Sequence, residues 1–367
     1  MVLEERQGMT IEDDPTAMRA SSRRSGPTSC APGAGSPEAA RTEMTASKPR
    51  PSQARETKAA SRWEEFAERG SLGALRLMAR LYDLLGRSLS RAILHPIAAY
   101  FFVRERGSRG PSRRYLERVW AHPEGRPRLR GRPGFFASYW HYHEFALQIF
   151  DRMVLWGHGL SELRMDHQGS EHLFALKREG RGGILIGAHL GSFDMPRQLA
   201  GGHGIALNVV MFTAHAERIN RFFKSLDPNS QMRVLSPEPG AVGTAFEIKA
   251  CLDRGELVGI MADRMPAGGG DMPILIDFLG HPMAFPLSPF RLACLLGVPT
   301  FLSLCLRKGD AHYEAVVRPL GNIAKVPPRD RDKAAVELAR AWVQGLEQAC
   351  LEHPYQWFNF YDTWEQA

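Results

Sequence analysis

The sequence predicts an α/β protein with a mostly parallel central sheet flanked by helices. From about residue 134 onward, short apolar runs recur that are too continuously apolar for strands with one face in water. Helical segments with one strongly apolar side separate most of these runs. Strands that alternate with helices favour parallel pairing in a sheet whose two faces are both covered.

Seven stretches are expected to form strands, and the segments between them helices. The strand stretches are GGILIGAH (182–189), IALNVVMF (205–212), MRVLS (232–236), LVGIMAD (257–263), PILIDFLG (273–280), PTFLSLCLR (299–307) and HYEAVVRPL (312–320). Helices are expected at 138–157, 193–200, 216–226, 243–254, 288–296 and 331–353. In such folds, ligands gather at the carboxyl ends of the parallel strands.

Composition divides the chain into three parts. Residues 1–61 are rich in Ser, Ala, Pro, Gly, Arg and Thr, and we expect them to be a disordered low-complexity tail. Residues 62–133 combine an amphipathic helix with an arginine-rich segment, and residues 134–367 form the α/β domain. The chain does not open with a basic region followed by an apolar run, so no signal peptide is expected.

The segment 72–94 has the pattern of an N-terminal amphipathic helix that lies in a membrane interface. On a helical wheel, its charged side chains share one narrow stripe, and leucine-rich faces cover the rest; the stripe consists of Arg76, Arg80, Asp83, Arg87 and Arg91. The uncharged residues 92–103 are too few to span a bilayer but enough to enter its interface. A helix of a soluble bundle with a solvated charged face is the alternative.

Positive charge is concentrated in residues 104–133, where ten arginines stand against three glutamates. The excess equals the net charge of +7 of the whole chain. Such charge attracts an anionic membrane, an acidic carrier protein or a nucleic acid. Few aromatic residues are interleaved with these arginines and the apolar segment adjoins them, so we expect anionic lipid headgroups and no nucleic acid.

Neither the cysteines nor the histidines have the spacing of a metal site. The five cysteines contain no C-x-x-C pair, so neither a disulfide framework nor a zinc site is expected. His141 and His143 are close in WHYHEF, but on a helix they point about 200° apart and would not share an ion. We therefore expect no metal.

The first candidate for chemistry is the pair of His189 and Asp194 in GAHLGSFD, directly after an apolar strand. A carboxylate beside a histidine fixes the tautomer of the ring and supports the imidazolium, so the pair can act as a general base. A turn with a helix-capping aspartate explains the same spacing. Asp263 and Arg264 follow another strand, in LVGIMADRMP, and are the next candidates.

Together with three later blocks, GAHLGSFD resembles the H-x4-D/E motif of the lysophospholipid acyltransferase superfamily. The likeness is greatest to its bacterial lipid A biosynthesis branch, the lauroyl and myristoyl transferases. The later blocks are LVGIMADRMP, the stretch from FLGHPMAFP to AVVRPL, and the closing HPYQWFNFYDTW in the place of the family's P-x-Q-W segment. The likeness runs from about residue 140 to the C-terminus and marks 134–367 as an acyltransferase domain.

The resemblance implies a membrane-associated O-acyltransferase. His189 would take the proton of an acceptor hydroxyl, and Asp194 would orient His189. Backbone N–H groups near Gly191 or a nearby arginine would stabilise the oxyanion. Substrate contacts are expected from Asp263, Arg264, Arg197, Arg218 and Arg221. The last two would contact an acidic carrier protein or the phosphates of a donor.

The resemblance implies no cofactor, because the acyl group comes from a thioester of acyl carrier protein or coenzyme A, which is a co-substrate. The acceptor is expected to be a hydroxyl of a glycolipid or of another lipid-linked molecule. The place of action would be the cytoplasmic face of the bacterial inner membrane.

Two departures from the relatives bear on the acceptor. FPLSPFR lacks the Glu and the Gly-Thr with which the glycerolipid enzymes bind glycerol phosphate. QWFNFYDTW ends in acidic and aromatic residues, where lipid A enzymes continue with basic ones. Both departures speak against the acceptors of those relatives. The sequence leaves the acyl chain length and the choice of donor open. A non-catalytic membrane-binding protein that kept the fold is the alternative function.

Overall fold

A computed structural model describes residues 71–192, 195–211, 233–235, 242–266, 271–321, 323 and 326–364. The chain divides into the units Met1–Pro49 and Arg50–Ala367, and all described residues belong to the second. The tail predicted at 1–61 and the helix predicted at 216–226 lie outside the described residues.

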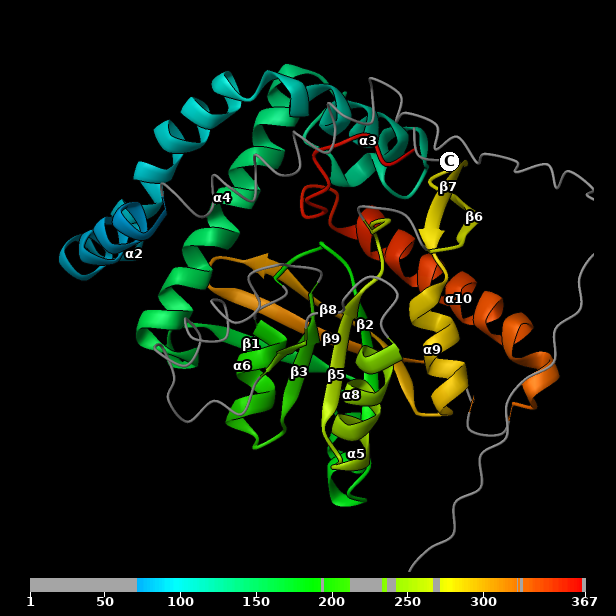
Figure 1. Cartoon of the computed structure of the whole chain (residues 1–367). Coiled ribbons are helices and arrows are strands. Elements are labelled where there is room, and N and C mark those ends of the chain that lie inside the picture. Colours follow the sequence, from blue (N-terminus) through cyan, green and yellow to red (C-terminus); the bar gives the residue numbers. More distant parts are fainter. Residues whose placement is uncertain are drawn as a thin grey trace, which may run out of the picture. The chain divides into compact units, whose positions relative to one another are not determined.

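Seven strands of the described residues form one sheet in the order β1-β9-β8-β2-β5-β3-β4 (Figure 1). They are β1 (Arg164–Gln168), β2 (Gly183–Gly187), β3 (Leu207–Val210), β4 (Val234–Leu235), β5 (Leu257–Met261), β8 (Thr300–Gly309) and β9 (His312–Gly321). Neighbouring strands from β8 to β4 pair in parallel, β9 is antiparallel to β8, and β1 is parallel to β9. The prediction of a mostly parallel sheet is confirmed.

Helices flank this sheet, as the sequence predicted. The α-helices are α2 (Ser71–Arg104), α3 (Arg109–Ala121), α4 (Phe135–His158), α5 (Glu171–Arg178), α6 (Met195–Gly202), α8 (Val242–Asp253), α9 (Ser288–Leu296) and α10 (Arg331–Glu352). Short 3₁₀ turns lie at Arg106–Ser108, Arg126–Arg128, Leu160–Glu162 and Pro328–Asp330.

Two apolar layers explain why the central strands are continuously apolar. Ile184 and Ile186 of β2 belong to a core cluster with side chains of α8, α9 and α10, whereas Leu185 belongs to a second cluster with side chains of α5 and α6. Trp342 of α10 also donates its indole N–H to the carbonyl of Ile186, at 3.0 Å. Because successive side chains point to opposite faces, the apolar side chains of β2 are buried in one layer or the other.

One predicted strand lies outside the sheet. β6 (Pro273–Phe278) pairs with β7 (His281–Pro286) in an antiparallel hairpin, and β7 was not anticipated from the sequence. The two residues that join them, Leu279 and Gly280, have φ values of 53° and 76°, as in a tight hairpin turn. A leucine in this conformation is unusual, so the sequence carries no ordinary turn signal there.

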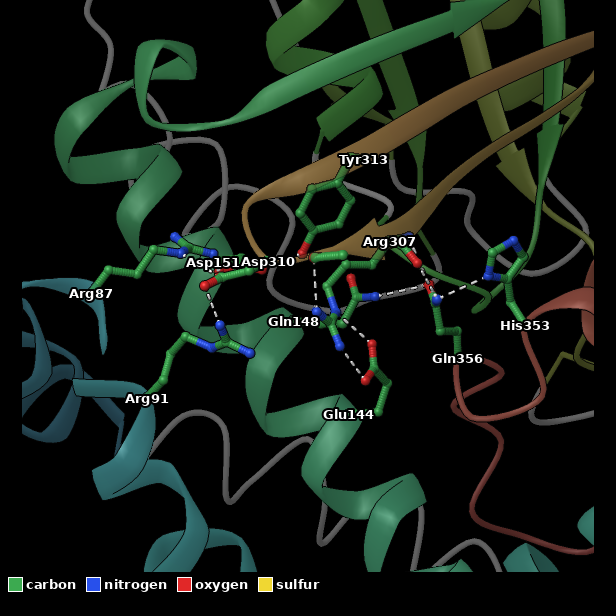
Figure 2. Close-up of polar contacts among 11 residues, drawn as sticks. Arg87, Arg91, Glu144, Gln148, Asp151, Arg307, Asp310, Tyr313, His353 and Gln356 are labelled. Atoms are coloured by element: carbon green, nitrogen blue, oxygen red, sulfur yellow. Dashed lines mark hydrogen bonds and ion pairs between the residues drawn. The ribbon is translucent and has the colours of Figure 1, made fainter. Parts of the chain in front are cut away.

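Helix α2 differs from the regular amphipathic helix that the sequence predicted. It is broken at Gly86, whose φ of 71° and ψ of 178° are not helical. Beyond the break the arginines turn inward: Arg87 pairs with Asp151 of α4 and with Asp310, and Arg91 also pairs with Asp310 (Figure 2). Arg87 and Arg91, the two arginines of the stripe beyond the break, therefore dock α2 onto the domain, whereas Arg80 and Asp83 are exposed.

Part of the apolar surface of α2 points away from the domain, whereas Leu94, Ala98 and Phe102 are buried against it. Leu84 is 80 % exposed, and Leu89, Tyr100 and Val103 are each more than half exposed. No helix among the described residues combines the length and the hydropathy that a bilayer crossing requires.

The inward arginine gives a test of this docking. Asp151 is 1 % exposed and accepts hydrogen bonds from Arg87 and, at 2.6 Å, from the Tyr313 hydroxyl. Arg87→Ala leaves this buried carboxylate without its cation, and we expect the free energy of unfolding to fall by about 3 kcal/mol. Arg91→Ala is the matched control: its partner Asp310 is half exposed, so the loss should stay below about 1 kcal/mol. Urea unfolding measures both, and equal losses in the two variants would contradict the inward docking.

Candidate active site

The carboxyl ends of β2 and β5 bring His189 and Asp263 together. The two strands pair in parallel with Gly187 opposite Met261, and each of the two polar residues follows its strand by two positions. The chain thus places them side by side at one edge of the sheet. His189 Nδ1 lies 2.7 Å from Asp263 Oδ1, and the backbone N–H of His189 donates to Asp263 Oδ2 at 2.9 Å.

The C-terminal segment completes the surroundings of Asp263. The indole N–H of Trp357 and the side-chain amide of Asn359 both donate to Asp263 Oδ2, each at 3.0 Å. Asp263 is only 1 % exposed, so its desolvation is offset by these donors and by His189. Because donors occupy both oxygens, this carboxylate is suited to holding a ring rather than to contacting a substrate.

The segment itself is tied to the strand end by its backbone. Leu190 and Trp357 form an antiparallel bridge, and the N–H of Phe358 donates to the carbonyl of His189 at 2.8 Å. His141 of α4 contacts the carbonyl of Trp357 through Nε2, at 2.8 Å, and Ser112 through Nδ1. The position of Trp357 is therefore fixed from two sides.

Charge determines which nitrogen of His189 carries the proton. Burial opposes ionisation of Asp263, but His189, Arg264 and the surrounding donors hold the pKa of its carboxyl well below the usual range. An ionised carboxylate only accepts hydrogen bonds, so the Nδ1 of a neutral His189 is the donor. The lone pair then resides on Nε2, to which no described residue donates a hydrogen bond.

The environment keeps His189 neutral. Burial lowers the pKa of the ring, the nearby Arg264 charge lowers it further, and Asp263 opposes both without reversing the net shift. The side chain is still 27 % exposed, so Nε2 is not sealed into the core. A neutral imidazole with an accessible lone pair and a carboxylate behind it has the composition of a general base.

Comparisons with known proteins show the family of the chain. A sequence model of the bacterial lipid A biosynthesis acyltransferases matches residues 69–366. The chain belongs to this family. It is also similar to two proteins named phosphatidylinositol mannoside acyltransferase. One, from Mycolicibacterium smegmatis, is 26 % identical over 58 % of this chain and 67 % of its own length. The other, from Mycobacterium tuberculosis, is 25 % identical over 72 % of this chain and 80 % of its own length. The protein is therefore an acyltransferase.

The other residues predicted for the site of this acyltransferase fall in different places. Arg264 donates through Nε to Asn359 at 2.7 Å and through Nη2 to the carbonyl of Phe358 at 3.1 Å, so it braces the C-terminal segment. Arg197 lies on α6, and only its backbone is described. The predicted orienting residue and the predicted donor contacts, Asp194, Arg218 and Arg221, lie outside the described residues.

The partner that orients His189 differs from the one expected. The sequence suggested Asp194 for this role, but Nδ1 is held by Asp263, which had been expected to contact substrate. The expected oxyanion donors are also engaged. The N–H of Gly191 donates to the carbonyl of Gln356 at 2.9 Å, and that of Ser192 to the carbonyl of Cys305 at 2.8 Å. These two groups are therefore committed to holding the strand end.

Trp357 and Asn359 were not anticipated as parts of the site. The segment QWFN was noticed for its place in the family pattern, and nothing in its local sequence says that an indole and an amide reach a carboxylate 94 and 96 positions earlier. Within the described residues, no group of three His, Cys, Asp or Glu side chains could hold a metal ion. The four described cysteines are free and buried.

Proposed function

We propose that this enzyme moves a fatty acyl group from an acyl thioester to a hydroxyl of a lipid-linked acceptor, with His189 as general base. The observation that carries the proposal is the His189–Asp263 pair, with Nδ1 donating to a buried carboxylate and the Nε2 lone pair available. Nε2 takes the hydroxyl proton as the oxygen attacks the thioester carbonyl. The C–S bond then breaks, and the thiolate leaves with that proton as a thiol.

Asp263 acts in this proposal as the positioning residue. It holds His189 in the tautomer that leaves Nε2 unprotonated, and its charge supports the imidazolium that forms as the hydroxyl proton is transferred. Trp357 and Asn359 keep the carboxylate in place by their hydrogen bonds. Arg264 keeps the resting ring neutral, because its charge lowers the pKa of His189.

The acceptor that best fits the family and its relatives is a glycolipid. The two similar proteins are named for acylation of a phosphatidylinositol mannoside, and a sugar hydroxyl is the kind of group that a neutral imidazole can deprotonate as it attacks. The donor is an acyl thioester of acyl carrier protein or coenzyme A. The reaction would take place at the cytoplasmic face of the inner membrane.

Thiol release tests the reaction. The full chain is incubated with acyl carrier protein or coenzyme A thioesters and a membrane lipid extract, and the lipid fraction is analysed by mass spectrometry. We expect free thiol and one class of newly acylated lipid to appear in equal amounts. Thiol release without an acylated lipid would indicate a thioesterase and would contradict the proposal.

The exposed apolar side of α2 gives the enzyme a way to reach such an acceptor. Phe136, at the start of α4, is 75 % exposed, and the neighbouring Phe135 is 59 % exposed. Phe135 contacts the buried Phe102 of α2, with ring centroids 4.8 Å apart, so this exposed ring lies beside α2. Arginines flank the surface on both sides in the sequence. Apolar groups beside cations suit an anionic membrane surface.

A double variant tests membrane docking. Tyr100→Ser with Phe136→Ser removes two exposed rings from this surface, and we expect affinity for anionic vesicles to fall by about tenfold or more. The matched control is Phe246→Ser with Leu295→Ser, two apolar side chains 67 % and 57 % exposed elsewhere on the enzyme. Sedimentation with vesicles measures both. Equal binding by the two double variants would place the membrane contact elsewhere.

A further inference from the structure

A cavity of about 270 Å³ lies apart from His189, between helices α2 and α4, the carboxyl end of β8 and the C-terminal segment. Its walls are polar and aromatic, and they carry three guanidinium groups against one carboxylate. The lining consists of Arg91, His95, Arg130, Trp140, His143, Glu144, Leu147, Arg307 and Tyr355. The volume is just below the range of ordinary small-molecule sites, so the cavity suits a headgroup-sized ligand rather than an acyl chain.

Two of the three arginines are neutralised by carboxylates. Arg307 forms a two-pronged ion pair with Glu144, with Nε 2.6 Å from Oε1 (Figure 2). Arg91 pairs with Asp310. The guanidinium of Arg130 instead lies over the Trp140 ring, 4.1 Å from its centroid, and no described carboxylate pairs with it. The cavity therefore carries one positive charge that nothing in the described chain balances.

His143 adds a donor without a partner. This residue is only 7 % exposed, and its Nε2 has no hydrogen-bond partner among the described residues. Its ring stacks on that of His95, with centroids 4.0 Å apart. A buried polar atom without a partner costs free energy, and an oxygen of a bound ligand would remove that cost. Burial and the neighbouring cations lower the pKa of His143 to about 4, so the ring is neutral and Nε2 can carry a hydrogen.

The cavity adjoins the exposed apolar surface. His95 of α2 is exposed and hydrogen-bonds to the Tyr139 hydroxyl at 3.0 Å. Tyr139 contacts Phe102, whose ring also meets Phe135 of the apolar surface. A molecule held with its apolar part on that surface would thus have its polar part near this cavity.

The C-terminal segment separates the cavity from His189. The side chain of Gln356 accepts a hydrogen bond from the N–H of Arg307 at 2.8 Å and donates one to its carbonyl at 2.7 Å (Figure 2). The next side chain, Trp357, reaches Asp263. Neither His189 nor Asp263 lines the cavity, so its occupation does not require contact with the catalytic pair.

We infer that this cavity binds a phosphate group. A guanidinium without a carboxylate partner, a buried N–H donor and further arginines at the walls are the groups that recognise phosphate oxygens in proteins. The phosphate belongs either to a lipid headgroup or to a soluble phosphate. The site is distinct from the proposed general base, and binding there does not depend on acyl transfer.

Calorimetric titration of the full chain in neutral detergent tests the site, with two probes. The first is inorganic phosphate, and the second is nanodiscs that contain phosphatidic acid, compared with nanodiscs that contain diacylglycerol. Arg130→Gln is expected to weaken binding of at least one probe by about tenfold or more. The matched control is Arg126→Gln, which removes the same charge from an arginine of the same segment that lies over Trp120 outside the cavity.

His143→Phe supplies a second variant, because it keeps a ring that can stack on His95 but removes Nε2. It should weaken the same probe as Arg130→Gln, whereas His189→Ala should bind both probes as the wild type does. Selective loss with inorganic phosphate identifies a soluble phosphate as sufficient, and selective loss with phosphatidic acid alone identifies a lipid headgroup. Absence of saturable binding, or equal loss in the Arg126 and Arg130 variants, would overturn the inference.

Discussion

His189→Ala is expected to lower kcat for acyl transfer by about 10²–10⁴-fold while the fold is retained. Without the imidazole, the acceptor hydroxyl has to attack the thioester with its proton still in place. The backbone contacts of residue 189 do not depend on the side chain: its N–H still donates to Asp263, and its carbonyl still accepts from Phe358. The thiol-release assay with mass spectrometry of the lipid product measures the loss.

Two further variants separate chemistry from structure. His189→Gln keeps a side-chain donor for Asp263 but offers no base, so it should be as inactive as the alanine variant. His312→Ala removes another histidine that pairs with an aspartate at 2.7 Å, through Nε2 to Asp166, and should leave kcat unchanged. Near-normal turnover of His189→Ala in a folded protein would remove His189 from the mechanism and indicate that another group acts as the base.

The parts of the fold that the sequence predicted are those with a strong local signal. The helix expected at 288–296 ends where it was placed, because Gly297 adopts a left-handed conformation with a φ of 62° and stops it. β2 was predicted because both of its faces are apolar. β1, with the sequence RMDHQ, was missed because it lies at the edge of the sheet and is partly exposed, so its composition is that of a loop.

The site was only half predictable for a different reason. His189 was found because it follows an apolar strand within a short motif, which is a local pattern. Its pairing with Asp263 depends on β2 lying next to β5, and strand order is a property of the whole sheet. Asp194 was preferred as the partner because it is close in sequence. Contacts across 74 positions, such as that of His189 with Asp263, leave no local trace.

Helix α2 shows how one residue can defeat a periodic pattern. The wheel assumed 100° per residue throughout, but Gly86 breaks the helix between Asp83 and Arg87. The arginines beyond the break then meet buried and half-exposed carboxylates of the domain. The amphipathic pattern separated charged from apolar residues, but it could not tell that residues of both kinds would face the protein.

Asp263→Asn is expected to lower kcat by about 10²–10⁴-fold, by changing the tautomer of His189. Three donors converge on Oδ2: the backbone N–H of His189, the Trp357 indole and the Asn359 amide. An asparagine would place its single oxygen there, because its amino group cannot accept these bonds. The amino group then faces Nδ1 of His189, which has to accept instead of donating. The proton moves to Nε2, and the base is lost.

The pH dependence of this variant distinguishes a positioning role from a structural one. The lowered pKa of His189 predicts that the acid limb of wild-type kcat/KM lies below about pH 6.5, the value of an ordinary histidine. Asp263 raises the pKa of His189, so Asp263→Asn should move the limb of its residual activity to still lower pH. Arg264 lowers that pKa, so Arg264→Gln should move the limb to higher pH. A purely structural effect would lower kcat/KM at every pH and leave the pH of the acid limb unchanged.

The pH dependence of the free energy of unfolding provides a second, independent test of the ionisation of Asp263. The pKa of its carboxyl is depressed in the folded state, so its contribution to the free energy of unfolding is present above the unfolded value of 3.8 and is lost as pH falls toward the folded value. The ionised Asp263 carboxylate therefore stabilises the wild type relative to Asp263→Asn, and this contribution to the stability difference should shrink as pH falls below about 4. Urea unfolding across this range measures it.

Asp151→Asn is the control, at a buried carboxylate whose pKa is raised instead. Its stability difference from the wild type should not shrink in acid, and the variant should retain kcat. A contribution of Asp263 that did not shrink below about pH 4 would mean that Asp263 is protonated in the folded enzyme, and His189 would then lack the carboxylate on which the proposed mechanism depends.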